Sequence, residues 1–400
     1  MTRNERIRIA LIGTGKRGRN VRLPAIRMMS DRFELAAVCD MNGDTARRVA
    51  AECGVPAYTR VQDLVAGERL DAAAISTPGD SHHAIGTYLA ERGIHIIVET
   101  PLATTLPLCD VLIEAVDRNG VKLEVAEQYC RDPLHLAKRQ IVEQGLIGDV
   151  LRVFTMFLTE GCHIVSSLRM FLGDAVATRV GSVAMNSPIP RVNANAVRSY
   201  DTEEWNLQTM EFDSGAVAVT SYSNVYHAQA LGRKARTLFQ IDGTTGSIVE
   251  DDVHLTTEEQ RLAGGGRATA YPIRTVTRDD GGIQVVERLQ IDTDPPVVWE
   301  NPWPRYRTDA MGLAIVEEMD SLAQAVAEDR PTRYDARRAR ADIEISMAAA
   351  ESGRPGRGAV ELPLTSVTEY EQQLHAKFAS DHGCDPFDTE RVVDVFFPEL

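Results

Sequence analysis

Cysteine is scarce in this chain, with six residues among 400 and no two of them in a Cys-x-x-Cys spacing. No apolar run approaches the roughly 20 residues of a membrane-spanning helix. The stretch Met1–Arg6 is too polar for a signal peptide. These absences argue against a disulfide framework and a membrane span. We therefore expect reduced thiols and a cytoplasmic location.

Positive charge is also in short supply. The chain has 43 Lys and Arg residues against 58 Asp and Glu residues, a net charge of −15, and a pI near 5.1. Nucleic acids and anionic membranes both require a basic face, so neither is an expected partner. The adjacent His82 and His83 would point about 100° apart on a helix. Without a third ligand at a coordinating spacing, no metal site is expected.

What the chain does have is a regular alternation of strand and helix patterns up to Glu127. With 400 residues it is longer than one compact core usually allows, so two domains are expected. The alternation predicts a doubly wound parallel sheet with right-handed crossovers. The expected strands are Ile7–Ile12, Glu34–Cys39, Ala72–Ser76, His95–Val98 and Lys122–Val125. The expected helices are Asn20–Met29, Asp44–Cys53, Ser81–Arg92 and Leu106–Asn119.

The turn after the first strand has the pattern Gly-x-Gly-x-x-Gly. It consists of Gly13, Thr14, Gly15, Lys16, Arg17 and Gly18. The glycines let the backbone turn sharply, approach a pyrophosphate and pack a helix on the strand, and the helix N-terminus faces the phosphates. The second strand ends in Asp40, which can accept hydrogen bonds from the ribose hydroxyls of NAD and repels the 2′-phosphate of NADP. Met41 and Asn42 supply no cation to offset that repulsion, so the expected cofactor is NAD.

Polar residues also follow the other strands, at the edge where ligands of doubly wound sheets bind. Besides the glycine turn and Asp40, the residues at these strand ends are Thr77, Pro78, Glu99, Thr100, Pro101, Gln128 and Tyr129. We expect Thr100 and Tyr129 nearest to the chemistry and the others on the cofactor.

The pattern changes after Asp132. A helix (Pro133–Gln144), a strand (Val150–Phe157) and a second helix (His163–Leu172) are expected first. Short turns then join strand patterns, which predicts an antiparallel sheet. The paired patterns are Leu207–Phe212 with Ala216–Tyr222 and those flanking Gly243–Gly246, and the later helices are Thr308–Glu328 and Asp335–Glu351. The glycine-rich segment Leu262–Asp280 is expected to be a mobile loop or hairpin tip. The expected domains are residues 1–129 and 130–400.

Several strings, in this order, resemble the glucose-fructose oxidoreductase, inositol 2-dehydrogenase and MocA family. Besides the glycine turn and Asp40, they are Asp71–Pro78, Ser81–His83, Gly93–Ala103, Gln144–Val150, Gly243–Ile248 and Tyr334–Ser352. The resemblance implies a Rossmann domain followed by an α+β domain whose open-faced, mostly antiparallel sheet often forms a dimer interface. It also implies a homodimer or homotetramer that oxidises or reduces a hydroxyl-bearing carbon of a sugar, cyclitol or polyol. Within it, His82 matches a position that lines the nicotinamide pocket.

The chain departs from the family at a residue that usually handles a proton. Between Glu99 and Pro101, where the family usually places a lysine, this chain has Thr100. A hydroxyl can orient a substrate, but its pKa is too high for a general base near neutral pH. The sequence leaves open whether Thr100 reflects altered chemistry or lost activity.

A second family signature, an acid followed after three residues by a histidine, is half retained. The histidine is His163, whose ordinary pKa of about 6.5 suits a general base or acid. Thr159 stands where the family usually has the acid, and Ser166 stands where it often has a further acid. Arg131 lies one residue after the position at which the family often has an arginine. The expected catalytic residues are thus His163, Thr100 and Tyr129, and the expected substrate-binding residues are Arg131, Thr159 and Ser166.

Three functions remain open from the sequence. The first is an NAD-dependent oxidoreductase with net hydride transfer. The second is a redox-neutral enzyme that recycles bound NAD, as an epimerase or eliminase, and the third is a non-catalytic NAD-binding sensor or regulator. Accumulation of NADH separates the first from the second, and loss of turnover in His163→Ala separates an enzyme from a sensor.

Overall fold

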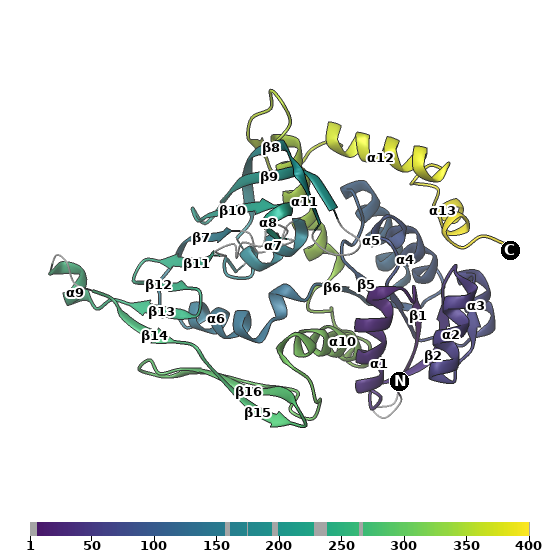
Figure 1. Cartoon of the computed structure of the whole chain (residues 1–400), viewed down its shortest axis with the longest axis horizontal. Helices are drawn as coiled ribbons and strands as arrows, with labels where there is room; N and C mark the ends of the chain where they lie inside the picture. Colours follow the sequence, from purple (N-terminus) through teal and green to yellow (C-terminus); the bar gives the residue numbers. More distant parts are fainter. Residues whose placement is uncertain are drawn as a thin grey trace. The chain divides into compact units, whose positions relative to one another are not determined.

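The computed structural model describes residues 6–156, 161–173, 175–193, 199–227, 238–263 and 267–399, drawn as a ribbon in Figure 1. The chain forms two compact units. The first joins Met1–Gln128, Trp303–Ile343 and Glu369–Leu400, and the second joins Tyr129–Pro302 and Glu344–Thr368. The first change of unit, between Gln128 and Tyr129, lies one residue before the end of the expected first domain. The C-terminal part differs from the expectation, because two of its segments belong to the first unit.

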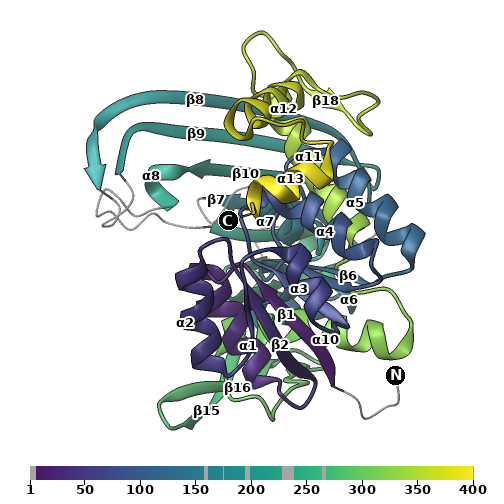
Figure 2. The ribbon, with the colours of Figure 1, turned by 90° about the vertical axis from the view of Figure 1, so that its right-hand side faces the viewer.

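The first unit is built on a six-stranded sheet in the order β3-β2-β1-β4-β5-β6, and all of its neighbouring strands pair in parallel. Its strands are β1 (Ile7–Ile12), β2 (Phe33–Cys39), β3 (Ala57–Tyr58), β4 (Ala72–Ile75), β5 (His95–Glu99) and β6 (Leu123–Ala126). The strand order reverses beside β1, which is the position where doubly wound sheets bind ligands. The predicted parallel sheet is confirmed, and Figure 2 shows its strands β1 and β2 with neighbouring helices.

Helices alternate with these strands. They are η1 (Gly18–Arg22), α1 (Leu23–Met28), α2 (Gly43–Cys53), α3 (Val61–Gly67), η2 (Gly79–Ser81), α4 (His82–Ala90) and α5 (Leu106–Asn119). Local chemistry sets the bounds of α2, since the Asn42 side chain accepts a hydrogen bond from the Thr45 N–H and Gly54 adopts the left-handed conformation at the other end. The helix expected from Asn20 starts earlier, at Lys16 within the glycine turn, and includes the π-helical turn η1.

A later segment completes the core of this unit. Helix α10 (Ala310–Glu328) packs beside α1 and against β5 and β6. Its side chains Val316, Met319 and Leu322 join one buried apolar cluster with Leu23 and Ile26. The C-terminal helices α12 (Glu369–His382) and α13 (Thr389–Phe396) also belong to this unit.

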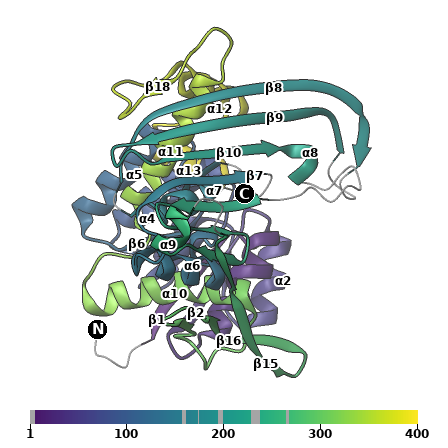
Figure 3. The ribbon, with the colours of Figure 1, turned by 90° about the vertical axis from the view of Figure 1, so that its left-hand side faces the viewer.

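The second unit contains a nine-stranded sheet in the order β14-β13-β12-β11-β7-β10-β9-β8-β18 and a three-stranded sheet, β15-β16-β17. The large sheet is mixed, because β7 and β10 pair in parallel and the other neighbours are antiparallel. Its strands are β7 (Val150–Met156), β8 (Ala177–Asn193), β9 (Ser199–Phe212), β10 (Val217–Ser223), β11 (Leu238–Gly243), β12 (Gly246–Val249), β13 (Asp252–Leu255), β14 (Thr269–Pro272) and β18 (Val360–Glu361). Figure 3 shows β8 and β9 as long curved strands side by side. The predicted α+β unit with a mostly antiparallel sheet is confirmed.

The other elements of this unit are short strands and helices. They are β15 (Arg274–Asp280), β16 (Ile283–Ile291), β17 (Val297–Glu300), η3 (Tyr129–Arg131), α6 (Pro133–Glu143), α7 (Gly161–Arg169), α8 (Asn224–His227) and α9 (Glu258–Leu262). The boundary between the units falls within α11 (Ala336–Ser352). No helix in the described part of the chain combines the length and the apolar character needed to cross a bilayer.

The expectation of a mobile loop or hairpin tip at Leu262–Asp280 was wrong for most of that segment. Leu262 ends α9, and Thr269–Pro272 and Arg274–Asp280 are strands of two different sheets. The pair Gly281 and Gly282, both with positive φ, makes the turn between β15 and β16. The glycines at 264–266 suggested a loop, but the Thr- and Val-containing stretch after them has β propensity; residues 264–266 lie outside the described residues.

Candidate functional site

The glycine turn after β1 is shaped by the packing of the first unit. Gly13 has a φ of +88°, and a Cβ there would lie 2.6 Å from the carbonyl of Ser76. A Cβ on Gly18 would lie 2.0 Å from the carbonyl oxygen of Gly13. By contrast, no heavy atom lies within 4 Å of a Cβ placed on Gly15. Gly13 and Gly18 thus serve the close packing of strand and helix, and the open space at Gly15 fits the approach of a pyrophosphate.

The carboxylate of Asp40 is tied to this turn. Its Oδ2 accepts hydrogen bonds from the Thr14 backbone N–H at 2.7 Å and the Thr14 hydroxyl at 2.9 Å. Its Oδ1 accepts one from the Asn42 N–H at 2.9 Å. Asp40 is half-buried, so solvent still reaches it at the end of β2. The residues present therefore fit a dinucleotide, with the open glycine turn beside an acid for the ribose hydroxyls.

Arg17 links the glycine turn to the ends of two neighbouring strands. Its Nε donates to Glu99 Oε2 at 2.8 Å, and its Nη2 donates to Gln128 Oε1 at 3.0 Å. Glu99 lies at the end of β5 and Gln128 follows β6, so one guanidinium holds three strand ends in register. Three residues predicted to bind the cofactor are thereby brought together.

Glu99 also takes part in a buried ion-pair network that the sequence did not predict. The Arg22 guanidinium, 1% exposed, donates to Glu99 Oε1 at 2.7 Å and pairs with Glu318 of α10 at 3.0 Å. Burial would raise the pKa of Glu99, but Arg22 and Arg17 outweigh it and hold that pKa below its usual value. Glu99 is therefore a charged anchor for the glycine turn. The signal in the sequence was a group of carboxylates, Glu317, Glu318 and Asp320, between the apolar residues of this helix.

His82 connects the turn after β4 to the turn after β5. Its Nδ1 lies 2.8 Å from the carbonyl oxygen of Pro101, and its Nε2 lies 2.9 Å from that of Thr77. The side chain is buried, and burial lowers its pKa. His82 thus fixes the turns that carry predicted cofactor residues. Its predicted place in the nicotinamide pocket stays a prediction.

The other residues of these two turns are held locally. The Thr77 hydroxyl shares a hydrogen bond of 2.8 Å with the Ser81 hydroxyl, and Ser81 Oγ lies 2.7 Å from the Pro78 carbonyl oxygen. Thr100 is half-buried and precedes Pro101 across a cis peptide bond. The hydroxyl at the family's lysine position is thus partly open to solvent at the end of β5.

In the second unit, the structure brings His163 and Tyr129 together. Their ring centroids are 4.9 Å apart and the ring planes are tilted by 49°. His163 lies on α7 and Tyr129 on η3, and these two helices pack against each other. A titratable imidazole in contact with a phenol can hold or pass a proton. Thr100, the third predicted catalytic residue, belongs to the first unit.

The structure does not bring the predicted substrate-binding residues together into one described site. The Ser166 hydroxyl donates to the His163 carbonyl oxygen at 2.9 Å, so in this structure it bonds to its own helix. Ser166 and Arg131 are both buried, with 2% and 4% of their surface exposed. Thr159 lies outside the described residues. The substrate-binding roles of these three residues stay predictions.

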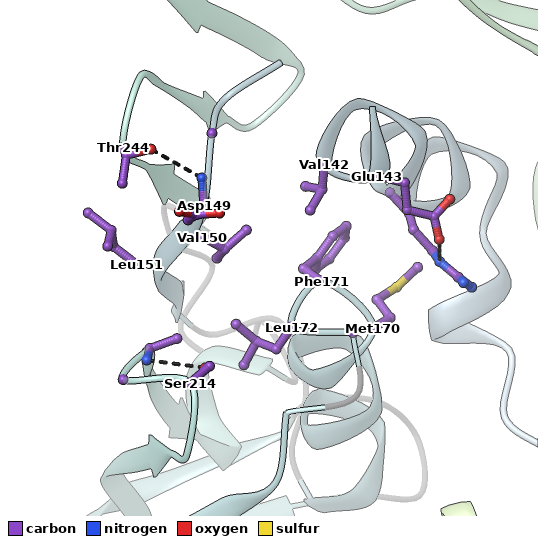
Figure 4. Close-up of a pocket in the computed structure, with 15 residues that line it drawn as sticks. Val142, Glu143, Asp149, Val150, Leu151, Met170, Phe171, Leu172, Ser214 and Thr244 are labelled. Carbon is purple, nitrogen blue, oxygen red and sulfur yellow. Dashed lines mark hydrogen bonds and ion pairs between the residues drawn. The ribbon is translucent and has the colours of Figure 1, made fainter. Parts of the chain in front are cut away.

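A separate pocket of the second unit has a volume of about 630 Å³ and is shown in Figure 4. Apolar side chains, including Val142, Phe171 and Leu172, form its walls, and Glu143 accepts a hydrogen bond of 2.6 Å from Arg139 at its rim. None of its lining residues is a predicted site residue. The pocket therefore adds no chemistry to the site described above.

Residues 7–127 match the family model described as an oxidoreductase family with an NAD-binding Rossmann fold. This Rossmann segment belongs to the glucose-fructose oxidoreductase, inositol 2-dehydrogenase and MocA family. The chain is an enzyme, an oxidoreductase, as the resemblance implied, and it binds NAD, as the glycine turn and Asp40 predicted. That Thr100 stands where the family usually has a lysine stays a prediction from the sequence.

Two curated proteins and a solved structure are similar to this chain over different lengths. D-apiose dehydrogenase of Paraburkholderia graminis is 25% identical over 333 residues, 77% of this chain and 79% of that protein. Inositol 2-dehydrogenase/D-chiro-inositol 3-dehydrogenase of Shouchella clausii is 31% identical over 150 residues, 37% of this chain and 43% of that protein. The crystal structure of an NAD-binding oxidoreductase from Klebsiella pneumoniae shares the fold, with a TM-score of 0.66, 20% identity and coverage of 90% of this chain and 99% of that one.

Proposed function

We propose that the enzyme transfers a hydride between NAD and a hydroxyl-bearing carbon of a sugar, cyclitol or polyol. The substrate class is supported by the relatives named as dehydrogenases of apiose and inositol. The observation that carries the proposal is the contact of His163 with Tyr129, because it retains a proton-handling group without the family's lysine. The cofactor site at Asp40 and the glycine turn supplies the other half of the chemistry.

In the oxidative direction, His163 takes the proton of the substrate hydroxyl while the hydride leaves the same carbon, and a carbonyl product forms. Bound NAD supplies the hydride acceptor at C4 of its nicotinamide. Tyr129 limits the orientation of the His163 ring through their contact. The Thr100 hydroxyl orients the substrate by hydrogen bonding and does not remove the proton, since its pKa is too high.

A substrate panel tests this function. Purified protein with NAD is offered sugars, sugar acids, cyclitols and glycosides, and the absorbance of NADH is recorded for each. We expect a substrate-dependent rise for at least one member of these classes. Conversion of a substrate without NADH would instead support internal recycling of NAD, and NAD binding without any conversion would support a sensor.

Variants of α7 test the role of His163. His163→Ala should lower kcat by about 10²- to 10⁴-fold, the usual contribution of a general base or acid, and should leave the Kd of NAD unchanged. Ser167→Ala is the matched control on the same helix, because its hydroxyl donates to the His163 carbonyl oxygen of the helix backbone at 2.9 Å. Equal kcat values for His163→Ala and the wild type would refute the assignment.

We also propose that the enzyme is a homo-oligomer that pairs through the face of β8 and β9. Val183 and Leu207 are opposite each other on these strands and are 59% and 37% exposed, and Met185, 55% exposed, lies on the same side. Exposed apolar side chains that adjoin one another mark interaction surfaces. Light scattering should show a dimer or tetramer that Val183→Glu dissociates, and a wild-type monomer would refute the proposal.

We propose a cytoplasmic location because of the state of the thiols. Cys39, Cys53, Cys109 and Cys384 are unpaired, which suits a reducing cytoplasm. Fractionation of the source cells, with the enzyme's activity followed, tests the location.

A further inference from the structure

The C-terminal helices of the first unit cover the two turns that carry the predicted cofactor residues. Figure 1 shows α12 and α13, in yellow, beside α5 and α4. Helix α13 packs on α4, and its side chains Val392 and Val393 are buried. Phe378 of α12 is buried as well. This C-terminal segment, residues 369–399, is therefore an integral part of the unit.

One face of α12 supplies polar contacts to both turns. Glu371, His375, Phe378 and His382 are spaced by four, three and four residues, so they lie along one side of the helix. His382 Nε2 is 2.8 Å from Asp80 Oδ2, in the turn after β4. At its other end, Glu371 Oε1 accepts a hydrogen bond of 2.9 Å from the Leu106 N–H.

The second turn receives a further contact. His375 Nε2 lies 2.8 Å from the hydroxyl of Thr105, and Thr105 and Leu106 lie four and five residues after Pro101. The two turns also touch each other, because a Cβ on Gly79 would lie 3.0 Å from Pro101 Cδ. The helix therefore spans a pair of adjoining turns and fixes both from outside.

Both side chains of the contact between Asp80 and His382 are closely surrounded. Oδ1 of Asp80 is buried and has no hydrogen-bond partner in the described part of the chain, and Oδ2 bonds to His382. The His382 ring is itself held between Phe378 and Phe396, with centroids 4.5 and 4.9 Å away. Asp80 lies three residues after Thr77 and two before His82. A displaced Asp80 would therefore shift the backbone from which the predicted cofactor contacts arise.

We propose that α12 forms a clamp that holds the two cofactor turns in their binding geometry, with His382, His375 and Glu371 as positioning residues. The inference rests on the proposed assignment of Thr77, Pro78, Glu99 and Pro101 to the cofactor. It predicts that NAD affinity depends on side chains that do not touch NAD. Because coupling is reciprocal, bound NAD also stabilises the clamp.

The test compares two anchors of the same segment in the full chain. His382→Ala removes the bond to the cofactor turn. Asp394→Ala is the matched control, since Asp394 anchors α13 to Gln62 of α3 at 2.9 Å, away from both turns. Isothermal titration with NAD should show a Kd about five- to tenfold higher for His382→Ala and an unchanged Kd for Asp394→Ala. His382→Gln, which keeps a donor, should restore most of the affinity.

The outcomes separate the clamp from general stability. Equal Kd values for the wild type and His382→Ala would overturn the clamp, as would an equal rise in Kd for His382→Ala and Asp394→Ala. Failure of the wild type itself to bind NAD would instead overturn the cofactor site. As a second readout, NAD should slow hydrogen exchange of amides in residues 369–382, and an unchanged exchange rate there would also contradict the inference.

Discussion

The pH dependence of stability should report on His83, a buried histidine of α4. Its Nε2 donates a hydrogen bond of 2.8 Å to the Pro386 carbonyl oxygen, and its Nδ1 is buried without a hydrogen-bond partner among the described residues. This pattern requires the neutral imidazole, because a proton on Nδ1 would have no acceptor. Burial lowers the pKa of His83 to about 4.

The sign of the effect follows from proton binding. The unfolded chain binds a proton at His83 with a pKa of about 6.5, while the folded chain does so only near pH 4. The stabilising contribution of His83 is therefore complete above about pH 6.5 and is lost as the pH falls toward 4. Between pH 7.5 and 5.0 the loss amounts to about 2 kcal/mol of the free energy of unfolding.

His83→Gln isolates this contribution, because glutamine keeps a donor for Pro386 and does not titrate. Urea denaturation at pH 7.5 and pH 5.0 gives the free energy of unfolding of each protein. The decrease between the two pH values should be about 2 kcal/mol larger for the wild type than for His83→Gln. Equal decreases would show that His83 is protonated in the folded protein, and the packing argument would be refuted.

Four further substitutions test other features. Gly18→Ala should lower the Tm by several degrees because its Cβ would lie 2.0 Å from a backbone oxygen, whereas Gly15→Ala should leave the Tm unchanged and raise the Kd of NAD at least about tenfold; calorimetry and titration check both. Asp40→Ser should reduce the preference for NAD over NADP by about tenfold or more, measured as a ratio of kcat/KM values, because it removes the charge that repels a 2′-phosphate. Lys138→Met should raise the free energy of unfolding by about 1 kcal/mol in urea denaturation, since this ammonium is 2% exposed and has Asp251 at 3.3 Å.

The first unit was the part that sequence patterns predicted best. The first strand and the helix Leu106–Asn119 have the predicted bounds, because buried parallel strands are continuous apolar runs and glycine ends this helix. The short β3 and α3 were missed, since two or seven residues carry too little periodicity. The return of α10 and α12 to this unit could not be predicted from local patterns, which do not say against which surface an amphipathic helix packs.

The candidate site was predicted unevenly for similar reasons. The glycine turn and Asp40 form a local signature, and the structure places them in contact. Arg22 and Glu318 are separated by almost 300 residues of sequence, so only the fold could reveal their ion pair. The clamp side chains likewise make contacts that are specified by tertiary packing, although their spacing along α12 was visible in the sequence.

The composition of the first unit from three separate segments has a consequence for synthesis on the ribosome. Its sheet is complete at residue 126, but the apolar surface for Val316 and Met319 stays uncovered until α10 has emerged. The whole of the second unit's main segment is translated in that interval. The Rossmann sheet of the nascent chain therefore stays partly exposed while almost two hundred further residues are translated. A fragment that ends near residue 128 is expected to bind chaperones or aggregate.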